Sequence, residues 1–271
     1  MSRLRSHLQS LAARGEKALG MFITSGFPER NATPDLLRAI DAGGADFIEL
    51  GMPFSDPLAE GIPIQRSSAR ALAGGITMKD TLAHAAAFTA SSDTPLLLMG
   101  YGNPVMRYGV SNFFRDARSS GVQGVILPDV LPDPDSPFFR AAVEYGVDTV
   151  CLVSPTTPKE RLEHIDGLSS GFVYAVSVTG ITGTDTGSKD PIVAYLRRIG
   201  DIIRHNPVMV GFGIRTADDV RSMVSAADGA IVGSALVDLV GDCWDDPALS
   251  PADRLAAVTA FVADLKAGTH G

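Results

Sequence analysis

The feature that most constrains the fold is a repeated alternation between short apolar runs and segments with helix-start signals. Eight runs of four to seven residues are almost wholly apolar, at 18–24, 46–50, 96–101, 124–128, 149–153, 172–178, 208–211 and 229–233. Continuous apolar runs are typical of parallel strands covered on both faces. Because parallel neighbours need crossover connections, the segments between the runs are expected to be helical.

Most of those segments open with a residue that caps a helix. Proline follows the cap in five places: Thr33-Pro34, Ser136-Pro137, Thr157-Pro158, Asp190-Pro191 and Ser250-Pro251. Thr77 with Asp80, and Thr216 with Asp219, have capping-box spacing. A helix is also predicted over 111–119, and an amphipathic helix over 2–16 precedes the first strand.

Eight strand–helix units in 271 residues predict an α/β protein, a single-domain (β/α)8 TIM barrel over 1–271 with an additional N-terminal helix. The alternative is an open doubly wound sheet, which usually has a glycine-rich turn after its first strand. The corresponding turn here, Ser25-Gly26-Phe27-Pro28, has no G-x-G-x-x-G pattern. The closed barrel is therefore favoured.

Charge and cysteine content narrow the classes of function. The net charge of -8 disfavours nonspecific binding of nucleic acid or of an anionic membrane surface. The two cysteines, Cys151 and Cys243, have neither CxxC nor Cys/His spacing, so no metal site is predicted. The N-terminus lacks the apolar segment of a signal peptide, and no apolar run has transmembrane length. A cytoplasmic protein is expected.

Glu49 is the leading candidate for catalysis. It lies in the second apolar run and shares a strand face with Phe47. A carboxyl group at the mouth of an apolar barrel should have a raised pKa, suited to proton transfer. A structural glutamate bound to a lysine or to backbone amides is the alternative.

The loop after Glu49 carries two further carboxylates. Glu60, near its end, could form an acid–base pair with Glu49, or it could be a solvated surface residue. Asp56 could cap a turn or contact a partner. Local sequence leaves both questions open.

Two glycine-containing strand ends indicate a phosphate site. The seventh run ends in Gly211-Phe212-Gly213, and the eighth ends in Gly233-Ser234. Barrels that bind phosphorylated ligands often use the loops after strands seven and eight, together with a helix N-terminus. The glycine-rich segment 179–188 follows the sixth run and could form a lid over the ligand.

Aromatic residues at strand ends could wall a pocket for a flat apolar ligand: Phe22, Tyr101, Tyr174 and Phe212. The alternative for each is a place in the barrel core. All five histidines fall on predicted helices or on the tail, and no serine or cysteine nucleophile motif is present. Proton chemistry is therefore assigned to carboxylates.

Four segments resemble the tryptophan synthase α subunit, the indole-3-glycerol-phosphate lyase family. They span 22–28, 48–59, 174–183 and 211–214, and the motif Glu49-Leu50-Gly51-Met52-Pro53-Phe54-Ser55-Asp56-Pro57 is the most specific of them. The resemblance implies a barrel lyase of tryptophan biosynthesis without a cofactor of its own. It implies retro-aldol cleavage of indole-3-glycerol phosphate to indole and glyceraldehyde 3-phosphate.

The resemblance also implies roles for individual residues. Glu49 matches the family's proton-transferring glutamate, and Thr182 matches a lid threonine. The phosphate contacts correspond to Gly183, Gly213, Gly233 and Ser234. The indole pocket corresponds to Phe22, Met99, Tyr101, Leu127, Tyr174 and Phe212.

A partner is implied as well. The family forms an αββα heterotetramer with a β subunit that binds pyridoxal phosphate and receives indole through a tunnel. Pro53, Asp56 and Asn103 match positions that face the β subunit.

One residue departs from the family pattern. Glu60 stands where the family has an aspartate that binds the indole N–H, so both Glu49 and Glu60 are predicted to be catalytic. An added methylene changes the reach of the carboxylate, and a shift of about 1 Å can cost about 100-fold in rate. Two alternatives stay open: a stand-alone indole-releasing lyase, and a weakly active regulatory partner of the β subunit.

Overall fold

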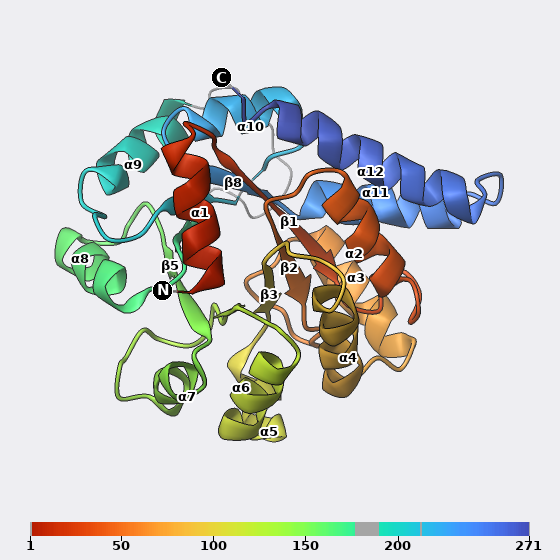
Figure 1. The fold of residues 1–271 in the computed structure, drawn as a ribbon, viewed down its shortest axis with the longest axis horizontal. Helices are drawn as coiled ribbons and strands as arrows, with labels where there is room; N and C mark the ends of the chain where they lie inside the picture. The colour runs from red at the N-terminus through yellow and green to blue at the C-terminus, as the bar shows by residue number, and fades with distance from the viewer. Residues whose placement is uncertain (1, 177–189, 212, 271) are drawn as a thin grey trace.

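A computed structural model describes residues 2–176, 190–211 and 213–270, and its strands form a closed barrel (Figure 1). Each strand pairs in parallel with the next, and β1 pairs with β8. The strands are β1 (Ala18–Thr24), β2 (Phe47–Gly51), β3 (Leu96–Met99), β4 (Gly124–Ile126), β5 (Asp148–Val153), β6 (Val173–Ala175), β7 (Val208–Val210) and β8 (Gly229–Val232). The predicted (β/α)8 barrel is confirmed. That residues 1–271 form one domain stays a prediction.

The helices surround the strands, and α11 and α12 lie side by side (Figure 1). They are α1 (Arg3–Ala13), α2 (Thr33–Ala42), α3 (Ile62–Ala73), α4 (Met78–Thr89), α5 (Gly102–Tyr108), α6 (Val110–Ser119), α7 (Pro137–Tyr145), α8 (Lys159–Leu168), α9 (Asp190–Gly200), α10 (Ala217–Val224), α11 (Ser234–Asp245) and α12 (Pro251–Ala267). The additional N-terminal helix is present as α1.

Three helices were not predicted from the sequence: α3, α5 and α11. None of the three has a side-chain hydrogen bond at its N-cap. The helices with clear capping signals behave differently, because Thr77, Thr216 and Ser250 each form a complete capping box. Helices α5 and α11 begin directly after β3 and β8, and α3 follows the long loop after β2, so all three start at the mouth of the barrel.

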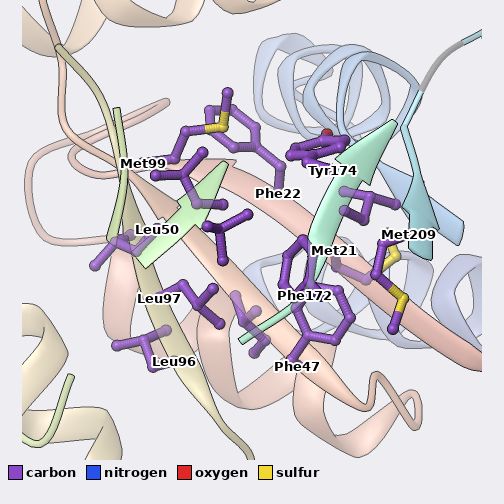
Figure 2. Packing of buried hydrophobic residues seen from close by; sticks show 14 of the residues in the cluster. Met21, Phe22, Phe47, Leu50, Leu96, Leu97, Met99, Phe172, Tyr174 and Met209 are labelled. Carbon is purple, nitrogen blue, oxygen red and sulfur yellow. The ribbon is translucent and has the colours of Figure 1, made fainter. Parts of the chain in front are cut away.

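Large side chains and glycines together fill the barrel interior. The rings of Phe47 and Phe172 lie 5.3 Å apart, in an inclined arrangement below Phe22, Met99 and Tyr174 (Figure 2). A Cβ atom on Gly20 would lie 2.3 Å from Cζ of Phe47, so this position requires glycine. Because these side chains fill the part of the barrel drawn lower in Figure 2, the open end of the barrel is at the carboxyl ends of its strands.

Candidate active site

Glu49 is the third of the five residues of β2, opposite Phe22 of β1 in the strand register. Its side chain is fully buried, and neither carboxylate oxygen has a hydrogen-bond partner among the described residues. Burial, and then the nearby charge of Glu60, raise the pKa of Glu49 to about 8. The predicted burial is confirmed, and the direction of the pKa change agrees with the prediction. The alternative of a structural glutamate held by a lysine or by amides finds no such contact in the described chain.

Glu60 reaches the same space from the loop between β2 and α3. The backbone N–H of Ala59 donates to the hydroxyl of Tyr101 over 3.0 Å, and the side-chain amide of Gln65 donates to the carbonyl of Glu60 over 2.9 Å. The N–H of Glu60 donates to the carbonyl of Pro57 over 3.1 Å. These contacts hold the loop against α3 and against Tyr101, the N-cap residue of α5. Burial raises the pKa of the Glu60 carboxyl to about 7.

Two carboxyl groups with different pKa values therefore face one space. Near neutral pH Glu49 is mainly protonated, while Glu60 is close to half ionised. Because the charge of one raises the pKa of the other, the two titrate as a coupled pair. One protonated and one ionised carboxyl group are what acid–base catalysis on a single substrate requires.

Aromatic and sulfur-containing side chains wall this space. Phe22 and Tyr174 are buried, and Figure 2 shows them beside Met99 at one level of the barrel. Tyr174 reaches across β7, since a Cβ atom on Gly211 would lie 2.2 Å from the Tyr174 hydroxyl oxygen. Burial, with the charges of Glu49 and Glu60, raises the pKa of Tyr174. These residues could hold a flat apolar ring next to both carboxyl groups.

Leu127 lies elsewhere, contrary to its predicted place in the ring pocket. Glu49 pairs with Leu97 and Leu97 pairs with Gly124, so Gly124 and Ile126 share the inward face of the barrel. Leu127 and Val125 are on the other face, where they line a cavity outside the strands. Ile126 is fully buried and is the β4 residue that points toward the interior. Counting strand alternation from Gly124 would have found it.

Two of the residues predicted to bind phosphate lie at the start of α11. Gly233 is the N-cap residue of this helix and Ser234 is its first residue. A Cβ atom on Gly61, the N-cap of α3, would lie 3.7 Å from the Ser234 hydroxyl oxygen, so the two helix starts lie side by side. Their free backbone N–H groups and positive dipole ends favour an anion.

The predicted site for phosphate and its lid includes further residues, of which Gly213 lies within the described part of the chain. Gly213 has φ of 62°, and no described residue would lie within 4 Å of a Cβ atom added to it. Thr182, Gly183 and Phe212 lie outside the described residues.

The rim of the mouth exposes the residues predicted to face a partner. Asp56 and Asn103 are exposed and Pro53 is partly buried. Two apolar side chains lie in the same segments, with Leu58 92% and Met106 57% exposed. The same part of the chain includes Phe54 and Tyr101, whose rings lie 5.3 Å apart. Exposed apolar side chains next to a polar rim are typical of a protein interface.

Metal-binding clusters and membrane-spanning helices are both absent from the described residues. No group of three or more histidine, cysteine, aspartate or glutamate residues there could hold a metal ion. Across residues 2–176, 190–211 and 213–270, no helix has the length and apolar character needed to cross a bilayer.

A closed (β/α)8 barrel with two carboxyl groups at its mouth, one of them fully buried, defines an acid–base enzyme of the TIM-barrel class. Residues 8–270 match the family described as "Tryptophan synthase alpha chain". The chain therefore belongs to the tryptophan synthase alpha chain family, which confirms the resemblance seen in the sequence.

Individual relatives are similar to this chain over almost its full length and theirs. The tryptophan synthase alpha chain of Burkholderia multivorans is 40% identical over 272 residues, covering 100% of this chain and 98% of that protein. The alpha chain of Geotalea uraniireducens is 42% identical over 99% of this chain and 98% of its own. The crystal structure of the alpha subunit of Legionella pneumophila has a TM-score of 0.90 at 34% identity, covering 99% of this chain and 98% of its own.

Proposed function

We propose that the chain cleaves indole-3-glycerol phosphate to indole and glyceraldehyde 3-phosphate, with Glu49 as the proton-transferring group. The family is a lyase family of tryptophan biosynthesis, so the reaction class follows from membership. The observation that carries the residue assignment is Glu49 itself: fully buried, without a hydrogen-bond partner in the described chain, and with its pKa raised to about 8.

The protonation state of Glu49 sets the order of steps. The carboxylic acid donates its proton to the indole ring carbon that carries the side chain. The resulting carboxylate then accepts the proton of the adjacent side-chain hydroxyl. As that proton leaves, the O–H electrons form the aldehyde C=O, the carbon–carbon bond breaks, and its electrons restore the aromatic ring. Glu49 ends protonated again, so no external acid is consumed.

Glu60 supports the charge that appears on the ring. Protonation of the ring carbon leaves positive charge on the indole nitrogen, and an ionised carboxylate can accept its N–H. The pocket that places the ring consists of Phe22, Met99, Tyr101 and Tyr174. The phosphate is bound by Gly213, Gly233 and Ser234, and by Gly183 from the segment outside the described residues, where Thr182 is the lid threonine that helps close the site.

The chain acts with a second protein. The alpha chain family implies a β-subunit partner, and the crystal structure of tryptophan synthase from M. tuberculosis in its aminoacrylate-bound form has a TM-score of 0.87 at 33% identity. Pro53, Asp56 and Asn103 contact this subunit in an αββα heterotetramer. Pyridoxal phosphate belongs to the β subunit, so this chain needs no cofactor of its own. The complex is cytoplasmic and binds neither nucleic acid nor membrane.

Indole release from indole-3-glycerol phosphate, with and without a β subunit, tests the function. We expect slow release by the chain alone and faster release with the β subunit. Rapid turnover without the β subunit would identify a stand-alone lyase. No turnover in either case would identify a regulatory partner, the alternative that the Glu60 departure supports.

Two sets of variants test the residues. Glu49→Gln should reduce the rate by about 10²–10⁴-fold, the usual contribution of general acid–base catalysis. Glu60→Asp should change the rate modestly, whereas Glu60→Ala should lose most of it. Full activity of Glu49→Gln would overturn the mechanism, and normal kinetics of Glu60→Ala would show that Glu60 takes no part.

A further inference from the structure

A cavity of ≈ 200 Å³ lies outside the barrel wall, between strands β4 and β5 and helices α7 and α8. Its lining is mainly aromatic and aliphatic, and includes Phe114, Val125, Leu127, Phe138, Phe139 and Ile165. Protein interiors rarely leave such space unfilled, because a void forfeits dispersion contacts. An apolar cavity of about 150 Å³ in another protein binds benzene, so this one has room for a small aromatic molecule.

Arg161 is the one charged residue in that lining. It is partly buried and forms no ion pair within the described part of the chain, where Glu163 of the same helix pairs with Lys159. Cys151 supplies no negative charge to balance it, because burial raises the pKa of its thiol to about 11. A partly buried guanidinium in apolar surroundings favours a carboxylate, which it can bind through two parallel hydrogen bonds.

The wall of the cavity packs directly on a segment of the mouth. A Cβ atom on Gly102 would lie 2.9 Å from Cγ2 of Val130 and 3.5 Å from Cζ of Phe138, and both of these residues line the cavity. The carboxylate of Asp129, which precedes Val130 in the chain, accepts the N–H of Gly102 over 2.9 and 3.1 Å. Movement of the β4–α7 connection therefore moves the start of α5.

Gly102 is joined to the carboxylate loop through its neighbour. The hydroxyl of Tyr101 accepts the N–H of Ala59 over 3.0 Å, and Glu60 follows Ala59 in the chain. One continuous set of contacts thus connects the cavity with Glu60. It consists of Phe138 and Val130, then Gly102 and Tyr101, then the loop.

We propose that this cavity is a binding site for a small aromatic carboxylate, whose ring lies among the phenylalanines and whose carboxylate binds Arg161, and that its occupation changes turnover at the mouth. The binding part stands by itself. The effect on turnover rests on the proposed function. Filling the cavity holds Phe138 and Val130 against Gly102, which fixes the Tyr101 hydroxyl on Ala59 and increases the rate.

Fluorine NMR with 4-fluorophenylacetate tests the site on the full chain. We expect saturable binding that weakens about tenfold in Arg161→Gln, which removes a charge-assisted hydrogen-bonding pair. Cys151→Leu, which fills the cavity from the barrel wall, should abolish binding. Arg140→Gln is the matched control, because Arg140 is an exposed arginine on α7 outside the lining. Thermal melts show that each variant is folded.

The outcomes separate the site from its effect. Absent binding, or binding unchanged in both Arg161→Gln and Cys151→Leu, overturns the site. Indole release is then measured with saturating probe. We expect an increase of about fivefold, at the lower end of allosteric coupling, which disappears in Arg161→Gln. Unchanged release with a bound probe overturns the coupling. Absent release without any probe contradicts the proposed function, while the binding result still decides the site.

Discussion

At the scale of single residues, the pair Glu49 and Glu60 predicts how activity depends on pH. Catalysis needs Glu49 protonated and Glu60 ionised. Their pKa values of about 8 and about 7 predict that kcat/KM falls above about pH 8 and below about pH 7. The apparent values belong to the coupled pair. Indole release measured from pH 5.5 to 9.5 should give a narrow bell, and a flat profile would contradict these assignments.

The raised pKa of Glu49 also predicts that the free energy of unfolding depends on pH. Its pKa is about 8 in the folded chain, above the ordinary value of 4.5, so the folded state prefers the protonated form. The associated stability is complete below about pH 4.5 and is lost as pH rises through 8. Relative to Glu49→Gln, the wild type should lose a few kcal/mol between pH 5 and 9, since one pKa unit is about 1.4 kcal/mol. Urea unfolding of both proteins at several pH values measures this, and parallel curves would refute it.

The hydroxyl of Tyr101 is expected to position Glu60. Tyr101→Phe keeps the ring but removes the acceptor of the Ala59 N–H, so the Glu60 loop is less well held. We expect kcat to fall about five- to tenfold with KM nearly unchanged, since such a bond contributes about 1 kcal/mol. Tyr108→Phe is the control, because it removes a hydroxyl that donates to Asp116 over 2.8 Å, away from the mouth. An equal fall in both variants would mean a general structural effect.

The residue scale shows where sequence reasoning succeeds and where it does not. Glu49 could be found because an ionisable group within an apolar run is costly and therefore informative. Leu127 was assigned to the pocket by resemblance, although alternation along β4 places Ile126 on the inner face. The register of a three-residue strand is set by its neighbours, so one displaced residue reverses the side-chain direction.

At the scale of elements, the sequence predicts the outer helices better than those around the mouth. The helices α4, α10 and α12 start with capping boxes that can be read locally. The starts of α3, α5 and α11 leave their backbone N–H groups without side-chain caps. Without a capping side chain, the N–H groups at the start of α11 are available to a ligand. The missing cap also removes the sequence signal from which the start of a helix is predicted.

The start of α11 predicts opposite effects on binding and on stability. Ser234→Asp puts a negative charge in the first helical turn, where the helix dipole favours it by about 0.3–1 kcal/mol. The same charge repels the substrate phosphate, so KM for indole-3-glycerol phosphate should rise at least about tenfold. Ser234→Ala, the neutral control, should raise KM only a few-fold. A thermal melt and steady-state kinetics measure both effects, and an unchanged KM in Ser234→Asp would place the phosphate elsewhere.

At the scale of the whole molecule, the order of the strands follows from the alternation of strands and helices along the sequence. The contacts between residues near the two ends of the sequence do not. Asp46, just before β2, accepts hydrogen bonds from the N–H of Leu19 over 2.7 Å and from the ammonium of Lys266 over 2.6 Å. Lys266 is 220 positions away in the sequence, near the end of α12. No periodic pattern links two charges so far apart, so only the folded barrel reveals the pair.

That pair predicts how strongly the C-terminal helix stabilises the barrel. The side chains of Lys266 and Asp46 are only 17% and 10% exposed, so Lys266→Ala leaves Asp46 as a poorly solvated, unpaired charge. Removing one partner of a fully buried pair costs about 3–5 kcal/mol, and the residual exposure reduces this to about 2–3 kcal/mol. Lys159→Ala is the matched control, since its pair with Glu163 is exposed and should contribute less than about 0.5 kcal/mol. If both variants lose the same free energy of unfolding in urea, the pair of Lys266 and Asp46 stabilises the barrel no more than an exposed ion pair does. A large loss for Lys266→Ala alone would show that a contact at the closed end stabilises the barrel that carries Glu49 at its mouth.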